Sequence, residues 1–141
     1  MMELKASKSS PPLGAIIMAQ LAKKDIKITW NNTSTTELNV GEGVILRTCS
    51  SIARYLARTG DLMDLYGGDN LESNTEIDHW LTFSIGPLGN HGEFKNALNY
   101  LDGVLAPITF LVGDSITIAD HVVFGTLFAS GFWQVSTFIH N

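Results

Sequence analysis

The spacing of apolar residues changes near Tyr66, and this change constrains the fold more than any other feature of the sequence. Before it, helical spacing is mixed with the two-residue alternation of short strands, whereas only helical spacing follows it. The elements expected before the change cover residues 11–23, 26–30, 37–40, 43–47 and 49–58, with a further short strand near Leu4. The sequence therefore predicts a small α/β lobe over residues 1–66 and an all-helical lobe over residues 71–141.

Three helices are expected in the second lobe. Ser73-Asn74-Thr75-Glu76 fits a capping box, in which a hydroxyl and a carboxylate satisfy backbone N–H groups at a helix start. The first helix is therefore expected to begin there and to end at Gly86-Pro87. The second has an apolar stripe at helical spacing, formed by Phe94, Leu98, Leu101 and Leu105. The third starts near Thr117.

The stretch D-S-I-T-I-A-D-H contains both a possible helix start and a possible catalytic pair. Thr117 and Asp120 are three residues apart, directly before an apolar run. In a helix starting there, the Thr117 hydroxyl accepts the N–H of Asp120, and the Asp120 carboxylate accepts the N–H of Thr117. An Asp120–His121 catalytic pair is disfavoured because neighbouring helical side chains do not face each other. We interpret the stretch as a structural N-cap.

Composition argues against two classes of function. The net charge is −5, from 9 Lys and Arg against 14 Asp and Glu, whereas a nucleic-acid-binding surface usually carries a basic stripe. We therefore expect no direct nucleic-acid binding. The uncharged run from Val122 to Phe138 is shorter than the roughly 20 apolar residues of a membrane span. We expect it to form a buried helix and not a membrane anchor.

A single cysteine, Cys49, excludes an internal disulfide and fits a reducing compartment. The N-terminus lacks the apolar core of a signal peptide, so a cytoplasmic location is expected. The four histidines show no ligand spacing with one another or with Cys49. The sequence therefore predicts no metal site and no cofactor.

A mixed α/β half followed by a helical half, with T-x-x-D opening a long buried helix, resembles the glutathione transferase fold. Four segments more closely resemble the N-terminal transferase-like domains of animal bifunctional glutamate/proline–tRNA ligases. They are P-P-L-G-A (11–15), S-I-A-R-Y-L-A-R (51–58), L-Y-G (65–67) and T-E-I-D-H-W-L (75–81), of which the last is the most specific. The resemblance covers the chain from about Pro11 to Gln134.

This resemblance implies a non-catalytic protein-binding domain with a role in translation. Such domains dock onto synthetase domains or scaffold proteins of the same fold, and so assemble an aminoacyl-tRNA synthetase into the cytosolic multi-synthetase complex. The chain contains no H-I-G-H-like or K-M-S-K-S-like element and is not expected to charge tRNA.

The same resemblance implies a docking face on the helices that carry R-Y-L and D-H-W-L. The residues expected at this partner interface are Arg54, Arg58, Asp78, His79 and Trp80. Arg54 and Arg58 are four residues apart and share one helix face. The alternative for each residue is that Trp80 belongs to the core and that the polar residues form a solvated face.

A divergent glutathione transferase is the alternative function. Transferases of this fold bind glutathione through an acidic residue and a serine at the start of the helix ending in Y-L, where this chain has Thr48 and Cys49. They also use a cis-proline before the third strand, but no proline occurs between Pro12 and Pro87. Two of the three expected glutathione contacts are therefore missing.

Two residues keep a possible chemical role in such a pocket. Ser9 or Ser10 either supplies a hydroxyl to a bound thiolate or, as we prefer, Ser10 caps the first helix with Pro11 at its first position. Cys49 is either a reactive thiol at a helix N-terminus or, as we prefer, a small core residue. We interpret Ser10, Thr48 and Cys49 as a vestigial glutathione pocket without transferase activity.

The family domain normally continues with further helices that cover the last buried one. By this resemblance the chain looks truncated at its C-terminus. Five large apolar residues would then lose their usual cover or would contact a partner: Phe132, Trp133, Val135, Phe138 and Ile139.

Overall fold

The computed structural model describes residues 2–22 and 24–129, which form a four-stranded sheet, five α-helices and two short 3-10 helices. The strands are β1 (Met2–Ser7), β2 (Ile26–Asn31), β3 (Glu37–Gly41) and β4 (Val44–Leu46). The helices are α1 (Leu13–Leu21), α2 (Cys49–Thr59), α3 (Leu71–Ile85), α4 (Phe94–Leu105) and α5 (Ile118–Ala129). The 3-10 helices are η1 (Met63–Tyr66) and η2 (Pro87–Gly89).

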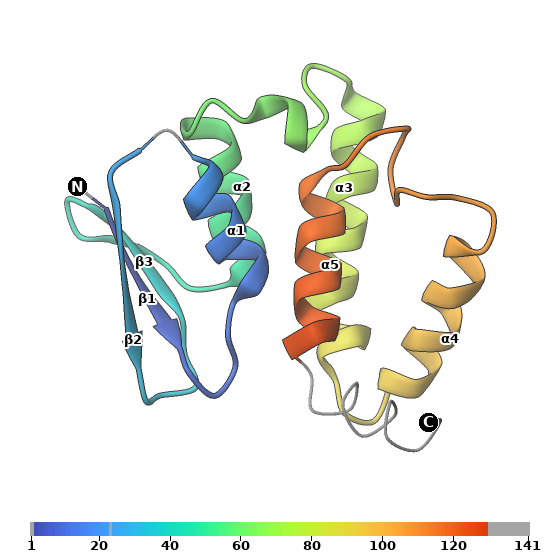
Figure 1. Cartoon of the computed structure of the whole chain (residues 1–141), viewed down its shortest axis with the longest axis horizontal. Helices are drawn as coiled ribbons and strands as arrows, with labels where there is room; N and C mark the ends of the chain where they lie inside the picture. Colours follow the sequence, from blue (N-terminus) through green and yellow to red (C-terminus); the bar gives the residue numbers. More distant parts are fainter. Residues whose placement is uncertain (1, 23, 130–141) are drawn as a thin grey trace.

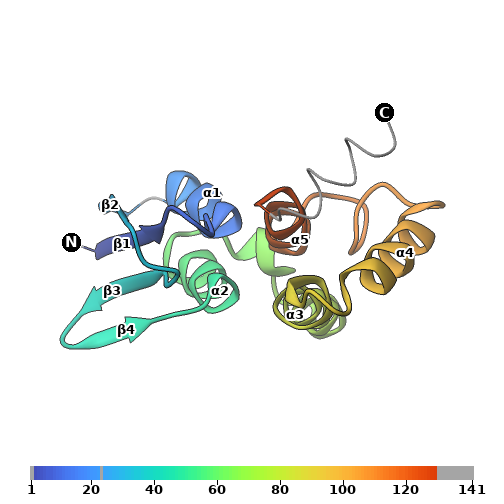
Figure 2. The same ribbon diagram turned by 90° about the horizontal axis from the view of Figure 1, so that it is seen from below.

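The elements stack in layers from the sheet outward. In Figure 1 the sheet lies at one end, α1 and α2 cover its inner face, α5 and α3 form the next layer, and α4 lies outermost. Figure 2 shows the same layers from below, with α1 beside α5 and α2 beside α3. Within residues 2–22 and 24–129, all strands precede residue 47, and only helices follow from Cys49 onward.

The sheet has the strand order β2-β1-β3-β4, with β1 parallel to β2 and antiparallel to β3. Leu4 in β1 stands opposite Ile28 in β2 and Leu38 in β3, and Leu4 and Leu38 are completely buried. Because strand residues alternate between faces, this row points toward the helices and the charged neighbours point away. The short strand predicted near Leu4 is therefore the central β1, and the predicted hairpin is formed by β3 and β4.

Helices α1 and α5 cross at two glycines, and this contact joins the first half of the chain to the second. A Cβ atom added at Gly14 would lie 2.8 Å from Val122 Cα. One added at Gly125 would lie 2.8 Å from the backbone nitrogen of Gly14. Real Cβ atoms essentially never approach other atoms so closely, so only glycine lets the two backbones touch here.

The predicted start of the first helix is wrong. Helix α1 begins at Leu13, its N-cap position is Pro12, and no side chain caps it. Ser10 lies before the helix, where its N–H donates to the Ser7 hydroxyl at 3.1 Å. The two prolines keep the chain out of a helical conformation for longer than the sequence pattern suggests, because the residue before a proline is disfavoured in helical geometry.

The predicted capping box of the first helix in the second half is also wrong. Helix α3 begins at Leu71, and the Asn70 side chain accepts the N–H of Ser73 at 2.9 Å. Asn70 has the extended conformation of a cap residue, whereas Ser73 lies inside the first turn. Asn70 therefore provides the cap that the sequence analysis assigned to Ser73.

One buried cluster runs through all layers except the outer face of the sheet. Its largest fully buried apolar side chains are Leu4, Met18, Leu38, Ile52, Leu56, Ile77, Leu81, Leu88, Ile118 and Val122. Helix α5 lies at the centre of the helical layers, between α1 and α3.

Among the residues described, no helix combines the length and the hydropathy needed to cross a bilayer. The predicted uncharged run extends past Ala129, outside the described residues, where the five apolar residues expected to need cover also lie.

Candidate functional site

Four polar side chains form a cluster where α2, η1 and α3 meet, and we call it the Arg54–Asp78 cluster. Arg54 Nη1 lies 3.1 Å from Asp78 Oδ1. The Tyr66 hydroxyl donates to the same carboxylate oxygen at 2.7 Å, and Arg58 Nη2 donates to the Tyr66 hydroxyl at 3.2 Å. The Arg58 guanidinium also lies 4.9 Å from the centre of the Tyr66 ring, within cation–π range.

Local structure explains why these residues meet. Arg54 and Arg58 are one helical turn apart on α2, and η1 carries Tyr66 back beneath them. Gly67 follows with a φ of 92°, in the left-handed region that glycine adopts readily, and it turns the chain toward α3. A Cβ at this position would also meet Ser73 Cβ at 2.9 Å, so this turn packs directly on the first turn of α3.

Two factors determine the protonation of Tyr66 in the cluster: its burial and the neighbouring Asp78 carboxylate. Burial raises the pKa of Tyr66, and its hydrogen bond to Asp78 raises the pKa further, so the phenol stays protonated and acts as a donor. The side chains of Arg54 and Asp78 are 28% and 43% exposed. An ion pair so accessible to water adds only about 0–1 kcal/mol of stability. The cluster therefore fixes the positions of charged groups at the surface more than it stabilises the fold.

The structure brings four of the five predicted interface residues to this region. Arg54, Arg58 and Asp78 belong to the cluster, and His79 is exposed beside it on α3. Trp80 contradicts the prediction, because only 6% of it is exposed. Its ring packs edge-on against Phe83 at 5.3 Å, so it is a core residue. A helix turns by about 100° per residue, so Trp80 points inward although His79, directly before it, is exposed.

Sequence reasoning missed Tyr66 as a member of this site. The residue belongs to the L-Y-G segment, but nothing local in the sequence indicates that its hydroxyl bonds Asp78, twelve residues further on. It also missed Asn74, whose side-chain amide donates to the carbonyl oxygen of Tyr66. An asparagine directly after a predicted cap is the one available signal for such a bond.

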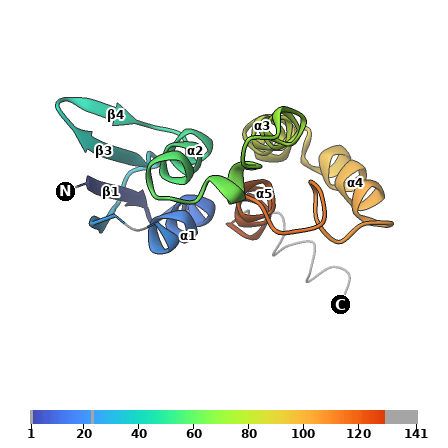
Figure 3. The ribbon, with the colours of Figure 1, turned by 90° about the horizontal axis from the view of Figure 1, so that it is seen from above.

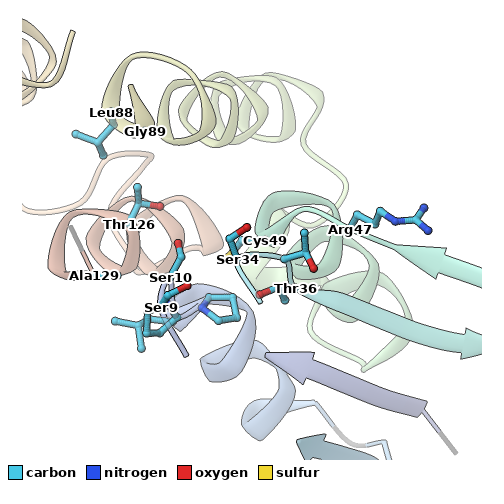
Figure 4. A pocket seen from close by; sticks show the side chains of 14 residues that line it. Ser9, Ser10, Ser34, Thr36, Arg47, Cys49, Leu88, Gly89, Thr126 and Ala129 are labelled. Carbon is cyan, nitrogen blue, oxygen red and sulfur yellow. The ribbon is translucent and has the colours of Figure 1, made fainter. Parts of the chain in front are cut away.

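A cavity of about 550 Å³ lies where the first turn of α1 faces α2, η2 and the end of α5. Figure 4 shows serine and threonine side chains around it. The labelled residues that line it are Ser9, Ser10, Ser34, Thr36, Arg47, Cys49, Leu88, Gly89, Thr126 and Ala129. Among the described residues that line this cavity, none is acidic. Its Arg47 has a carboxylate partner already, since Nε lies 3.5 Å from Glu37 Oε1.

The three residues predicted to form a vestigial pocket do not all lie in this cavity. Ser10 and Cys49 line it. Thr48 instead caps α2: its hydroxyl oxygen accepts the N–H of Ser51 at 3.1 Å. Burial raises the pKa of the Cys49 thiol, against the opposite effect of the backbone amides of Ala15 and Gly14. A thiol whose pKa is raised stays protonated and is a poor nucleophile, which favours the structural interpretation of Cys49.

Ser7, at the end of β1, forms hydrogen bonds that hold the segments at the rim of this cavity together. The sequence analysis did not predict this role. Ser7 is completely buried, and its hydroxyl donates to the carbonyl oxygen of Thr33 at 2.7 Å. The same oxygen accepts the N–H of Ser10 and lies 3.2 Å from the Ser9 hydroxyl. The Ser9 hydroxyl is thus tied into a structural network at the rim.

The predicted cap of the last helix is only partly correct. Asp120 Oδ2 accepts the N–H of Thr117 at 3.0 Å, as expected. The Thr117 hydroxyl accepts the N–H of Ala119 at 3.2 Å and not that of Asp120. The second carboxylate oxygen, Oδ1, accepts the N–H of Leu111 at 3.0 Å. Asp120 therefore has a structural role that extends to the connection before α5.

Within the described residues, no group of three or more His, Cys, Asp or Glu side chains is placed to hold a metal ion.

Known proteins are similar to this chain in two ways: some share its sequence over most of its length, and others share its fold at low sequence identity. No protein-family model matches the chain. The bifunctional glutamate/proline–tRNA ligase of Mus musculus is 40% identical over 131 residues, which are 93% of this chain and 9% of that protein. The ligase of the same description from Drosophila melanogaster is 32% identical over 128 residues, or 89% of this chain and 7% of that protein. The cytoplasmic glutamate–tRNA ligase of Arabidopsis thaliana is 29% identical over 92% of this chain and 18% of that protein.

Solved structures with low sequence identity share the architecture. Glutathione S-transferase 1-6 from Anopheles dirus species B has a TM-score of 0.76 at 19% identity, over 94% of this chain and 80% of that chain. A diazinon-metabolizing glutathione S-transferase from Bombyx mori has a TM-score of 0.76 at 16% identity, over 99% of this chain and 87% of that chain. The chain thus has the glutathione transferase fold, and in sequence it is similar to the N-terminal region of bifunctional glutamate/proline–tRNA ligases, of whose length it spans less than a tenth.

Proposed function

We propose that this chain is a non-catalytic docking domain that assembles an aminoacyl-tRNA synthetase into the cytosolic multi-synthetase complex. The observation that carries the proposal is the 40% identity to the mouse ligase over 93% of this chain but only 9% of that protein. A segment of this size with a transferase fold has no room for tRNA charging, so its contribution to a synthetase is binding. The partners in this proposal are synthetase domains or scaffold proteins of the same fold, in the cytoplasm.

The face formed by α2 and α3 supports this role. Arg54, Arg58, Asp78 and His79 present both signs of charge on one surface, and internal hydrogen bonds hold three of them in place. Such pre-organisation lowers the conformational entropy lost on binding. Charges at the rim of an interface mainly select the partner and its orientation, and this is what a docking domain among several similar folds requires.

The cavity beside α1 gives weaker support to the alternative, a divergent glutathione transferase. It is large enough for a small molecule, and hydroxyl groups line it. However, its described lining contains no carboxylate for a γ-glutamyl amine, and Thr48 caps α2. Burial also raises the pKa of the Cys49 thiol, which disfavours the reactive thiolate. We therefore propose binding, and not thiol chemistry, as the function of this fold.

The proposal is tested by a pull-down from cytosol with the chain as bait and identification of the captured proteins by mass spectrometry. The decisive variant is the double exchange Arg54→Glu with Asp78→Arg, which keeps opposite charges facing each other inside the cluster but reverses them toward a partner. The matched control is Lys95→Glu with Asp102→Lys, a charge exchange between exposed residues of α4.

We expect the wild-type chain and the control to recover synthetases or their scaffold proteins, and the Arg54/Asp78 exchange to lose most of them. Circular dichroism of each bait verifies that it is folded. A folded wild-type bait that recovers neither synthetases nor scaffolds overturns the docking proposal. If all three baits recovered the same proteins, the interface would not lie on α2 and α3.

A further inference from the structure

Arg58 is a cation on the face formed by α2 and α3 that forms no salt bridge within residues 2–22 and 24–129. This face has two arginines, both on α2, and α3 carries neither lysine nor arginine. Arg54 pairs with Asp78 at 3.1 Å. Arg58 is exposed, and the hydrogen bond that it forms with described residues goes to the neutral hydroxyl of Tyr66 at 3.2 Å. Its positive charge therefore remains available to a partner.

The Tyr66 side chain contacts the Arg58 guanidinium in two ways. The hydroxyl accepts the hydrogen bond, and the ring centre lies 4.9 Å from the guanidinium carbon. Tyr66 is itself only 4% exposed, and the Asn74 side chain donates to its carbonyl oxygen. Figure 3 shows from above how the segment that contains η1 runs from α2 across to the first turn of α3. A buried ring on this segment thus restricts an arginine that would otherwise sample many rotamers.

Asp78 determines the direction in which the Tyr66 hydroxyl bonds. The hydroxyl has one proton, and it donates this proton to Asp78 Oδ1 at 2.7 Å. Burial and the hydrogen bond to Asp78 raise the pKa of Tyr66, so the phenol keeps its proton. Toward Arg58 the phenol oxygen can therefore only accept. The hydrogen bonds run in one direction, from Arg58 through Tyr66 to Asp78.

The donors that Arg58 has left suit a carboxylate. A guanidinium has five N–H donors in a planar fork, and an Asp or Glu side chain binds two of them in parallel. A nucleic acid would instead require several cations that neutralise several phosphates, whereas the other arginine of this face is already paired with Asp78. The net charge of −5 also opposes a polyanion. The chemistry of this face therefore favours a protein partner with an acidic side chain.

We infer that Tyr66 is a positioning residue, which holds the Arg58 guanidinium ready for an Asp or Glu side chain of the docking partner. A charge that is held in place before binding loses less conformational entropy when the carboxylate arrives. The inference rests on the proposed docking function, and it adds the chemistry of one contact and the residue that prepares it.

The positioning role is tested without a partner, by titrating the full chain with acetate as the carboxylate probe against chloride at constant ionic strength. Chemical shifts of the arginine Nε–H groups report binding at each arginine. Tyr66→Phe removes the hydroxyl and keeps the ring beside Arg58. The matched control is Tyr100→Phe on α4, where the tyrosine is 52% exposed. Arg47 serves as the internal reference, because it is exposed and already lies 3.5 Å from Glu37.

We expect acetate to bind more tightly at Arg58 than at Arg47. Tyr66→Phe should weaken binding at Arg58 by about two- to tenfold, as for the loss of one hydrogen bond, and Tyr100→Phe should not change it. A hydroxyl with a merely structural role would lower the urea midpoint but leave the acetate affinity of the folded chain unchanged. Equal affinities in wild type and Tyr66→Phe, or equal binding at the two arginines, would overturn the inference.

The chemistry of the partner is tested by cross-linking in the cytosol pull-down. Arg58→Lys keeps the charge and introduces an amine, which a water-soluble carbodiimide joins to a nearby carboxylate as an amide, with loss of water. The control is Arg47→Lys, on the connection between β4 and α2. We expect mass spectrometry to find position 58 linked to an Asp or Glu of a recovered synthetase or scaffold protein, and position 47 to be unlinked.

The outcomes separate this inference from the docking proposal. A folded bait that recovers synthetases or scaffolds, but whose position 58 is linked to no carboxylate of theirs, overturns the inference and leaves docking in place. A folded bait that recovers neither refutes docking and the partner contact with it. In that case the acetate titration still decides whether Tyr66 positions Arg58.

Discussion

Replacing Gly125 by alanine tests whether the crossing of α1 and α5 holds the two halves of the chain together. An alanine Cβ at this position would lie 2.8 Å from the Gly14 nitrogen and 3.1 Å from Leu13 Cβ. Ordinary contacts begin near 3.4 Å, so the two helices must separate by roughly half an ångström. The Gly14 nitrogen is a backbone atom and Leu13 Cβ is bonded directly to the backbone, so neither can rotate away.

The expected effect combines two opposing contributions. Overpacking a tight contact costs about 1–3 kcal/mol. Replacing glycine by alanine inside a helix contributes about 1 kcal/mol in the other direction. Gly103 in α4 provides the control, because a Cβ there meets nothing within 4 Å. Gly103→Ala should therefore stabilise the protein by about 0.5–1 kcal/mol. The difference between the two variants in their change of unfolding free energy therefore measures the cost of the steric clash at the crossing, about 1–3 kcal/mol.

Urea unfolding followed by tryptophan fluorescence measures both variants under the same conditions. We expect the midpoint to fall for Gly125→Ala and to rise for Gly103→Ala, with unchanged slopes. If both variants were stabilised equally, α1 and α5 would not touch through their backbones, and the argument from the glycines would be wrong.

Three further predictions concern the caps and one histidine. Asn70→Ala should lower the free energy of unfolding by about 1 kcal/mol and Ser73→Ala by much less; equal losses in urea unfolding would support the capping box at Ser73 instead. Asp120→Ala removes the acceptor of two backbone N–H groups and should cost about 2–3 kcal/mol, with a smaller loss for Asp120→Asn. A loss below about 0.5 kcal/mol, as for an ordinary surface change, would contradict that role. Desolvation lowers the pKa of His121 despite the opposing effect of the adjacent Asp120, so the unfolded chain binds more protons below about pH 6.5 and stability falls as the pH drops through that value. His121→Gln should weaken this decrease, and an identical pH dependence of unfolding would refute the assignment.

Local sequence patterns were sufficient for the elements but not for their first residues. Alternation at Ile26 and Ile28 and the glycines around Glu42 correctly predicted strands and a hairpin, because these signals depend only on neighbours in the chain. Helix starts were less certain. Asn70 and Ser73 both carry a capping side chain, and the turn at Gly67 determines which of them has extended geometry. That turn is set by packing against α3.

The candidate docking face illustrates the same difference. Helical spacing placed Arg54 and Arg58 on one face of their helix, and the structure agrees. It could not show that Tyr66 would join them, or that Trp80 would turn into the core, because both depend on the angle at which α2, η1 and α3 meet.

The sequence by itself determined the order of strands and helices, the uncharged run that begins at Val122 and the similarity to a synthetase region, since each of these depends on residue types and their spacing along the chain. Only the tertiary structure decided which charges pair across α2 and α3, where the cavity lies, and which glycines touch. These features arise between residues far apart in sequence, and their distances depend on how whole helices pack.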